Sequence, residues 1–293
     1  MRNDITHRRN AALSRAKAIL AACCLLTSLC SGLHAHPGHD HKRQIVAHRG
    51  SSADRPENTL ASCKRAIEAG ATAVEVDVRM TKDRRLVVMH DAKLDRTTDG
   101  QGLVAETTLA EIKKLDAGSW FHPKYRNQRV PTLAEVFDTC RNRADVVLDL
   151  KVDDAQFFEA VVRHVRAKTR PRQVIVIVNN VAQARYFRRQ LPMCRQLGLL
   201  AGPDDIGPMA AAGVDVLRLR PPWMEDIEVV HALLKTRAKL HLIDRTGKPE
   251  GILPLLVRQP FSLSTDDPAR LIKVLADYKA GKLTPARKRP SSR

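Results

Sequence analysis

Side chains that could move protons or hold anions stand where apolar runs of this sequence end. His48 and Arg49 follow the run Ile45-Val46-Ala47, and Gly50 comes next. An imidazole changes its charge near neutral pH, a guanidinium binds anions, and glycine lets the backbone come close to a ligand. The same triplet is also typical of a basic surface turn, so it predicts a site only if other residues support it.

Three acidic side chains lie in two further apolar runs. Glu75 and Asp77 lie in VEVDV, and Asp149 and Lys151 lie in VVLDLK. Because side chains along a strand alternate between its faces, each polar pair points to one side. Such a pair often marks a solvent-facing edge, but carboxylates inside a barrel need a counter-charge. Three carboxylates with oxygen ligands favour a hard divalent ion, Ca²⁺ or Mg²⁺.

These side chains together have the equipment for cleaving a phosphodiester. A divalent ion and two cations could neutralise the phosphoryl group, while two histidines exchange protons with the attacking hydroxyl and the leaving alcohol. The predicted roles are catalysis for His48 and His90, phosphate binding for Arg49 and Lys151, and metal binding for Glu75, Asp77 and Asp149.

Short apolar runs alternate with helix-length amphipathic stretches from residue 44 onward. Strands are expected at 44–48, 72–78, 85–90, 145–151, 173–178, 196–201, 214–219, 239–244 and 261–265. Helices are expected near 59–69, 132–142, 154–169, 181–190, 204–212, 225–238, 249–258 and 267–279. This alternation predicts a parallel sheet covered on both faces, closed into an α/β (β/α)8 TIM barrel.

Two details of this barrel need separate predictions. Nine strands are expected where the barrel needs eight, and the weakest pattern, at 196–201, is expected either to lie outside it or not to be a strand. About forty residues separate the third strand from the helix near 132, so an insertion with a short helix is expected at about 92–131.

The ends of the chain differ in composition from its middle. Basic residues through Lys17 and an apolar stretch predict a signal peptide at 1–35, followed by a His-rich linker at 36–43. The phosphodiesterase domain is expected at 44–279, with a basic disordered tail at 280–293. A secreted or periplasmic protein is therefore expected, and a lipoprotein anchored through Cys23 is the alternative.

Charge and cysteine usage narrow the range of partners. The formal charge is +18, but aromatic residues make up only 4% and no nucleic-acid-binding motif is found. A small-molecule substrate without nucleic acid is expected, with peripheral membrane contact through the basic tail as an option, and no protein partner can be inferred. Beyond the signal peptide only Cys63, Cys140 and Cys194 remain, and this odd number argues against a disulfide framework.

Several motifs resemble the glycerophosphodiester phosphodiesterase family. They are IVAHRGSSADRPENT, AVEVDVRMTKDRRLVVMHD, LDRTTDGQG, TLAEIKKLDAG and VPTLAEVF, with STDDP resembling the closing strand. The resemblance implies a (β/α)8 fold with a small insertion, a divalent metal, and hydrolysis of glycerophosphodiesters to glycerol 3-phosphate and an alcohol. Carried over by position, it implies the same site roles as above. Glu57 and Asn58 match a Pro-Glu-Asn run and are supporting residues, although Asn58 could instead cap the first helix.

Two departures from the family pattern leave alternatives open. Asp149 stands where the family usually has glutamate, so its reach to a metal is shorter by one methylene. The second half offers VIVIVNN and LHLIDRT in place of the family's later signatures. The alternative functions are phospholipase-type cleavage of intact or lyso-phospholipids at a membrane, and a non-catalytic barrel that binds phosphate or metal.

Overall fold

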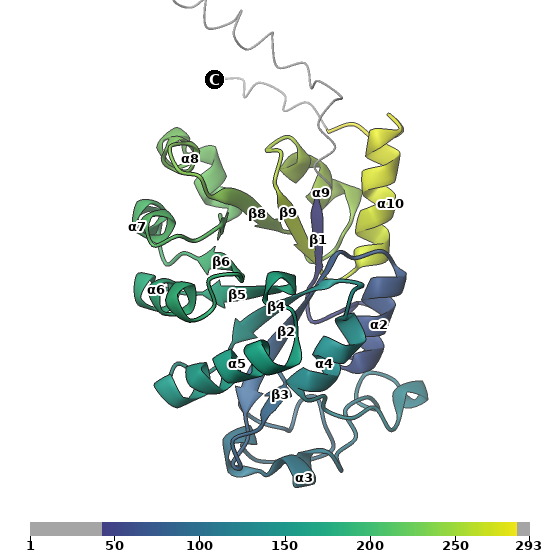
Figure 1. Ribbon diagram of the computed structural model, residues 1–293. Coiled ribbons are helices and arrows are strands. Elements are labelled where there is room, and N and C mark those ends of the chain that lie inside the picture. Colours follow the sequence, from purple (N-terminus) through teal and green to yellow (C-terminus); the bar gives the residue numbers. More distant parts are fainter. Residues whose placement is uncertain (1–42, 286–293) are drawn as a thin grey trace, which may run out of the picture. The chain divides into compact units, whose positions relative to one another are not determined.

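The fold is a closed barrel of parallel strands with helices on its outside (Figure 1). This computed structural model describes residues 43–285. The strands are β1 (Gln44–Ala47), β2 (Ala73–Met80), β3 (Leu86–Val88), β4 (Asp145–Leu150), β5 (Val174–Val178), β6 (Arg195–Leu199), β7 (Val216–Arg218), β8 (Lys239–Ile243) and β9 (Ser262–Thr265). All except β3 pair in parallel around the ring, and β1 closes it by pairing with both β9 and β2. The predicted (β/α)8 barrel is confirmed.

Amphipathic helices follow the strands and cover the outside of the barrel (Figure 1). They are α2 (Leu60–Glu68), α4 (Leu133–Cys140), α5 (Ala155–Lys168), α6 (Val181–Gln190), α7 (Ile206–Ala211), α8 (Ile227–Leu234), α9 (Pro249–Leu256) and α10 (Pro268–Lys279). In α5, Phe157, Val161 and Val165 are buried at a spacing of four residues, and Asp154 caps the first turn. Each helix lies within the range that the sequence predicts for it.

β3 is the strand that lies outside the barrel. It pairs antiparallel with β2, and Met80 lies opposite Leu86. Only residues 81–85 separate the two strands, which is enough for a hairpin but too short for the crossover that a parallel neighbour needs. The prediction that 196–201 lies outside is wrong, because β6 pairs with both β5 and β7. Gly198 weakens the pattern of β6 but lets Leu217 pack close to its backbone.

The core has two apolar layers, one on each face of the strands. The larger layer lies between strands and helices and includes Val74, Val76 and Val78 of β2. The smaller layer fills the barrel interior and comes from strands alone: Val46, Ala73, Val147, Ile175, Ile177, Leu197 and Val216. Because Ala73 points inward, the alternation of β2 also turns Glu75 and Asp77 inward.

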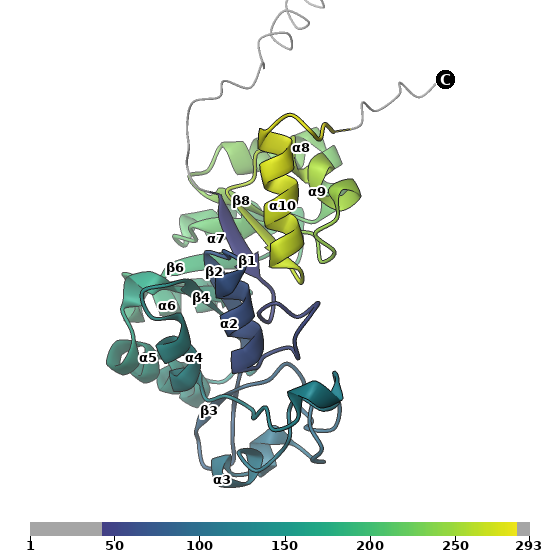
Figure 2. The same cartoon turned by 90° about the vertical axis from the view of Figure 1, so that its right-hand side faces the viewer.

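The segment between β3 and α4 forms a small lobe with its own core (Figure 2). It contains the 3-10 turns η1 (Val104–Glu106) and η2 (Pro123–Tyr125) and the short helix α3 (Leu109–Ile112). Leu94, Val104 and Ile112 are buried together in this core. The Tyr125 hydroxyl donates to the Asp54 carbonyl at 3.1 Å, which ties the lobe to the loop after β1.

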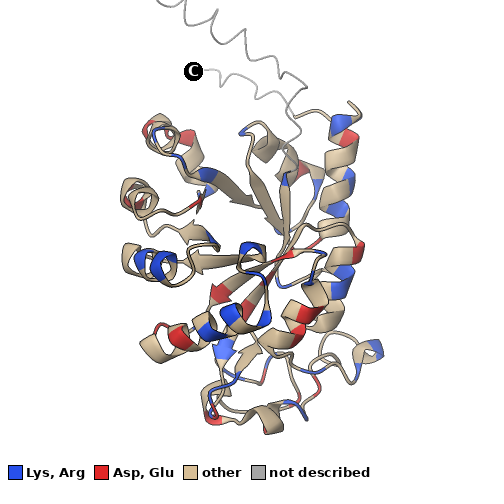
Figure 3. Cartoon of the chain, in the orientation of Figure 1, with Lys and Arg blue, Asp and Glu red and all other residues tan. Residues whose placement is uncertain are grey.

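Basic residues are spread over the outside of the barrel (Figure 3). The helix α6 alone carries Arg185, Arg188 and Arg189. Arg188 is paired with Asp215 at 2.7 Å, so part of this charge is neutralised locally. The remaining positive charge lies on several helices rather than on one element.

Several predictions concern residues that the structure does not describe. The signal peptide at 1–35, nearly all of the linker at 36–43 and most of the tail at 280–293 lie outside residues 43–285, and these boundaries stay predictions. In the described part of the chain, no helix is both long and apolar enough to cross a membrane. Cys63, Cys140 and Cys194 are buried and free.

Candidate active site

Three carboxylates meet inside the barrel on β2 and β4. Asp77 of β2 and Asp149 of β4 are direct neighbours in the strand pairing, and Glu75 lies two residues before Asp77. One oxygen of each carboxylate lies within 4.8 Å of the others. Glu75 and Asp77 are only 4% and 1% exposed. The structure therefore brings the three predicted metal ligands together.

Two cations and one amide stabilise the charge of Asp77. Lys151 Nζ lies 3.0 Å from Asp77 Oδ1 and donates to Asp149 Oδ2 at 2.7 Å. Arg49 Nε lies 3.3 Å from Asp77 Oδ2, and Asn58 Nδ2 donates to the same oxygen at 2.7 Å. Burial alone would raise the pKa of Asp77, but Lys151, Asn58 and Arg49 outweigh it and lower the pKa. Asp77 is therefore ionised at neutral pH.

Glu75 has the opposite electrostatic balance. Its carboxylate accepts one hydrogen bond from the Arg49 N–H at 2.8 Å. Burial, followed by the charges of Asp77 and Asp149, raises the pKa of Glu75 well above its usual value. The cluster thus holds more negative charge than its neighbours neutralise. A divalent cation would replace the proton on Glu75, and the all-oxygen donor set fits Ca²⁺ or Mg²⁺.

The loop after β1 has a strained backbone that brings Arg49 to the carboxylates. Arg49 and Asn58 have φ values of 58° and 56°, which residues with a side chain adopt only at an energetic cost. Their hydrogen bonds to the acids of β2 offset this cost. Gly50 follows with φ of 80°, and a side chain there would overlap Ser62 of α2. This position therefore requires glycine.

Asn58 contacts the carboxylate cluster instead of capping a helix. Thr59 is the cap of α2, because its side chain accepts from the Ser62 N–H. Asn58 donates to the Asp77 carboxylate, and its Oδ1 accepts from the Asp77 N–H at 3.2 Å. The capping interpretation of Asn58 is wrong, and the two contacts fix the orientation of Asp77.

His48 lies directly after β1 and is oriented by Asp266. Its Nδ1 lies 2.7 Å from Asp266 Oδ1. Asp266 directly follows β9, the strand that pairs with β1. A carboxylate that accepts from Nδ1–H leaves Nε2 for a reacting group. The sequence analysis did not assign Asp266 to the site, although the STDDP motif that contains it was noted.

His90 has a similar arrangement after β3. Its Nδ1 lies 2.6 Å from Asp91 Oδ1. Arg79 of β2 donates from Nε and Nη2 to the His90 carbonyl at 3.0 and 2.6 Å, which fixes the backbone. Hydrogen bonds from Arg96 and then from His90 hold the pKa of Asp91 well below its usual range. Asp91 therefore remains an ionised partner for the imidazole.

Glu57 links Arg49 to the partner of His90. Arg49 Nη1 donates to Glu57 Oε1 at 2.9 Å. Arg96 donates to both oxygens of Glu57, at 2.8 and 3.0 Å, and to Asp91 Oδ2 at 2.6 Å. Burial would raise the pKa of Glu57, but Arg96 and Arg49 lower it overall. The sequence analysis did not identify Arg96, which lies in the quoted motif LDRTTDGQG.

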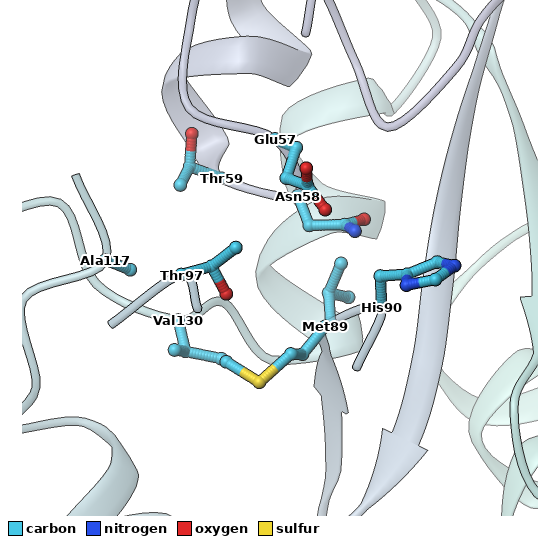
Figure 4. Close-up of a pocket in the computed structure, with 9 residues that line it drawn as sticks. Glu57, Asn58, Thr59, Met89, His90, Thr97, Ala117 and Val130 are labelled. Atoms are coloured by element: carbon cyan, nitrogen blue, oxygen red, sulfur yellow. The ribbon is translucent and has the colours of Figure 1, made fainter. Parts of the chain in front are cut away.

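A small pocket separates the loop after β1 from the insertion lobe (Figure 4). Glu57, Asn58 and His90 line it from the barrel side. Thr97 and Ala117 line it from the lobe. The lobe is therefore one wall of this pocket, and the ring of His90 points away from Thr97 and Ala117 (Figure 4).

The polar residues that follow β5 and β8 take part in local turns. Asn180 in VIVIVNN caps α6 by accepting from the Gln183 N–H. Asp244 in LHLIDRT accepts from the Thr246 hydroxyl and the Gly247 N–H, both at 2.8 Å. Within residues 43–285, no second group of three potential metal ligands is found.

The comparison with family models agrees with this geometry. The model described as the glycerophosphoryl diester phosphodiesterase family matches residues 48–205, a range that ends before β7. The glycerophosphodiester phosphodiesterase of Caldanaerobacter subterraneus subsp. tengcongensis is 35% identical over 243 residues. This alignment covers 80% of the present chain and 98% of that protein.

Solved structures show the same fold in related enzymes. The glycerophosphodiester phosphodiesterase from Agrobacterium tumefaciens has a TM-score of 0.68 and 27% identity, covering 79% of this chain and 99% of its own. A phosphodiesterase from Oleispira antarctica, in complex with the product sn-glycerol-3-phosphate, has a TM-score of 0.67 and 25% identity, covering 80% and 96%. The present chain therefore belongs to the glycerophosphoryl diester phosphodiesterase family and is a phosphodiesterase.

Proposed function

We propose that this enzyme hydrolyses glycerophosphodiesters to glycerol 3-phosphate and an alcohol, with one divalent cation held by Glu75, Asp77 and Asp149. The observation that carries the proposal is this carboxylate trio, whose excess negative charge calls for a cation. The substrate class is supported by the relatives, one of which was solved with sn-glycerol-3-phosphate as its product.

Lys151 and Arg49 are proposed to hold the phosphoryl group beside this cation. A divalent ion at the trio would supply Lewis-acid stabilisation of the phosphoryl oxygens. Lys151 has three N–H donors, and two of them face Asp149 and Asp77. The third donor is left for a phosphoryl oxygen. We propose Asp149 as the third metal ligand, either direct or through a water, because its carboxylate lies with those of Glu75 and Asp77. It also accepts a hydrogen bond from Lys151.

His48 and His90 are proposed as the proton-transfer pair. Asp266 and Asp91 bind the Nδ1 sides of the two rings, so each Nε2 is left for the reacting oxygens. One Nε2 takes a proton from the attacking water as its oxygen bonds to phosphorus, and the other gives a proton to the leaving alcohol as its bond to phosphorus breaks. The two imidazoles thereby exchange protonation states, and total charge is conserved.

Two other functions have weaker support. Cleavage of phospholipids at a membrane depends on the basic tail, of which residues 286–293 lie outside the described part of the chain. A non-catalytic phosphate- or metal-binding barrel depends on Asp149 replacing the family's usual glutamate. Asp149 nevertheless lies within 4.8 Å of the other two potential ligands, so the shorter side chain does not separate the trio.

The test measures release of glycerol 3-phosphate from glycerophosphocholine, glycerophosphoethanolamine and glycerophosphoserine, with Ca²⁺ or Mg²⁺ and with a chelator. His48→Ala and His90→Ala are compared with His231→Ala, an exposed residue of α8. We expect chelation and both site variants to lower the rate by at least about 100-fold. The control His231→Ala should keep the native rate. Rates insensitive to chelation and to both variants would overturn the mechanism. Absence of turnover of all three substrates would overturn the function.

We also propose that the enzyme acts in the periplasm or after secretion. The support is the N-terminal sequence, in which basic residues through Lys17 precede an apolar stretch of signal-peptide length. The N-terminus of the mature protein provides the test. A start near residue 36 agrees with signal cleavage, a lipid-modified Cys23 agrees with an anchor, and an intact Met1 in the cytoplasm contradicts export.

A further inference from the structure

Arg218 is an inward-facing cation that the proposed reaction does not use. It is the last residue of β7, at the end of the barrel where active sites of this fold form. Val216 packs in the barrel interior, whereas Leu217 packs against the helices. The alternation along the strand therefore turns Arg218 into the barrel.

Within residues 43–285 no carboxylate pairs directly with the guanidinium of Arg218, although Asp149 acts on it through its charge. Its side chain is partly buried, yet across residues 43–285 it makes neither a hydrogen bond nor an ion pair. Elsewhere in the sheet, Arg195 is paired with Asp145. A partly buried cation without a partner is energetically unfavourable, and an anion from a ligand would remove this penalty.

The neighbours of Arg218 in the sheet supply no negative charge. Its direct partners are Leu199 of β6 and His241 of β8. His241 is buried and its Nδ1 lies 2.7 Å from the Ser262 hydroxyl. Burial and the charge of Arg218 lower the pKa of His241 to about 3, so the ring is neutral. An anion bound by Arg218 would therefore meet no competing or repelling carboxylate at its partner positions on the two neighbouring strands.

Two further arginines add positive charge to this side of the barrel. Burial lowers the pKa of Arg218, the charges of Arg220 and Arg245 lower it further, and Asp149 acts in the opposite direction. Arg220 lies over the ring of Trp223 at 5.1 Å. Asp149 already accepts a hydrogen bond from Lys151, so it does not neutralise the three arginines. We call Arg218, Arg220 and Arg245 the arginine cluster.

We propose that the arginine cluster, with Arg218 as its contact residue, binds a second anionic group of the substrate. The enzyme would then prefer glycerophosphodiesters whose alcohol carries a carboxylate or a phosphate, an inference that rests on the proposed function. Glycerol is uncharged, so a second anion can only belong to the leaving alcohol. The transferred phosphoryl group has its own partners in Arg49 and Lys151. A guanidinium binds carboxylate or phosphate through two parallel hydrogen bonds.

Two matched pairs of substrates test this preference. Glycerophosphoserine differs from glycerophosphoethanolamine by one carboxylate, and glycerophosphoinositol 4-phosphate differs from glycerophosphoinositol by one phosphate. We expect kcat/KM to be about 10-fold higher for the anionic member of at least one pair, and that pair identifies the anion. Equal values within both pairs would overturn the inference. No turnover of any of the four would instead overturn the proposed function.

Substitutions of Arg218 separate substrate choice from other roles. Arg218→Met should bring the preferred pair to nearly equal kcat/KM without lowering the value for the member that lacks the anion, and Arg218→Lys should have a smaller effect. Arg237→Met, at an exposed position before β8, is the control and should leave the ratio unchanged.

Two outcomes would assign Arg218 another role and overturn the inference. An equal loss of kcat/KM for all four substrates would show that Arg218 holds the transferred phosphoryl group. A clear fall in the melting temperature of Arg218→Met would show a structural role. We expect no such fall, because the substitution removes a partly buried charge that has no partner.

Discussion

The two halves of the barrel use their inward-facing strand ends differently. In β1, β2 and β4 these ends carry a histidine and three carboxylates, and each has a polar partner nearby. In β6, β7 and β8 the residues that lie level with one another near the ends are Leu199, Arg218 and His241, a single cation between an apolar side chain and a neutral ring. Under our proposals, the first half performs the reaction and the second half selects the alcohol.

The halves also differ in the sign of their uncompensated charge. The raised pKa of Glu75 shows an excess of negative charge in the first half. The unpaired Arg218 shows an excess of positive charge in the second. Each excess matches a different component of the proposed complex, the metal ion on one side and the acidic alcohol on the other.

The strongest test of this division is Glu75→Gln. We expect activity to fall by at least about 100-fold, because the variant replaces a charged metal ligand by a neutral amide. Ile177→Val, an apolar change inside the barrel on β5, between the two halves, should keep activity. Measurements of kcat/KM and of the melting temperature with and without Ca²⁺ or Mg²⁺ check both. Similar losses in the two variants would break the comparison.

Glu75→Gln also tests how pH affects the folding stability of the metal-free enzyme. The folded-state pKa of Glu75 lies above its unfolded value. Its contribution to stability is therefore fully present below the unfolded pKa and is lost as pH rises through the folded pKa. Stabilisation by added metal should increase over the same range, since the cation replaces the proton. Glu75→Gln should remove both trends.

Substitutions of Asp149 test whether it is the third ligand of the metal site in the first half of the barrel. We expect Asp149→Asn to weaken Ca²⁺ or Mg²⁺ binding by roughly 10- to 100-fold, because it loses a charge next to Lys151. Asp149→Glu should bind at least as tightly as the native protein, because it restores the longer carboxylate. Calorimetric titration measures both. Native-like affinity in Asp149→Asn would exclude this residue from the site.

A substitution of His241 tests whether the buried ring of this residue is uncharged in the folded protein. Its folded-state pKa of about 3 lies below the ordinary value of 6.5, so the unfolded chain binds a proton first as pH falls. The free energy of unfolding should then decrease by roughly 2 kcal/mol between pH 7 and pH 5 from this group. Denaturant unfolding of His241→Gln should lack this component, whereas His231→Gln should retain it. An unchanged pH dependence in His241→Gln would contradict the burial of a neutral ring.

The smallest expected effect comes from Arg96, which joins the insertion lobe to the first half. Arg96→Met should lower kcat by roughly three- to tenfold, because Glu57 and Asp91 lose their shared donor. Its effect on the melting temperature should be small, since Arg96 is 43% exposed. Arg129→Met, which removes a contact within the lobe, is the control. Equal kcat in both variants would mean that the link to Asp91 does not position His90.

Local patterns in the sequence are enough to predict the barrel and its first half. The period-two alternation identifies β2 and β4 and places Glu75, Asp77 and Asp149 on inward faces. β3 was wrongly expected to belong to the barrel, because its own residues form a good strand pattern. The information that excludes it from the barrel lies in the short connection to β2.

Contacts between distant segments could not be predicted in the same way. Asp266 stands 218 positions after His48, and only the closure of β9 onto β1 brings them together. Arg218 presents the converse difficulty. The sequence does not show whether a carboxylate lies next to an arginine at the end of a strand. The lack of an ion-pair partner for Arg218 could therefore be found only from the structure.

The two ends of the insertion lobe lie side by side on the barrel. The Val88 N–H donates to the Pro131 carbonyl at 2.9 Å, and Val87 forms an isolated bridge with Thr132. The lobe thus begins and ends at adjacent points beside β3, so its length is free to change without moving the barrel strands. A protein engineer could therefore replace most of this lobe as a unit, keeping Arg96 and Tyr125 for their contacts with the loop after β1.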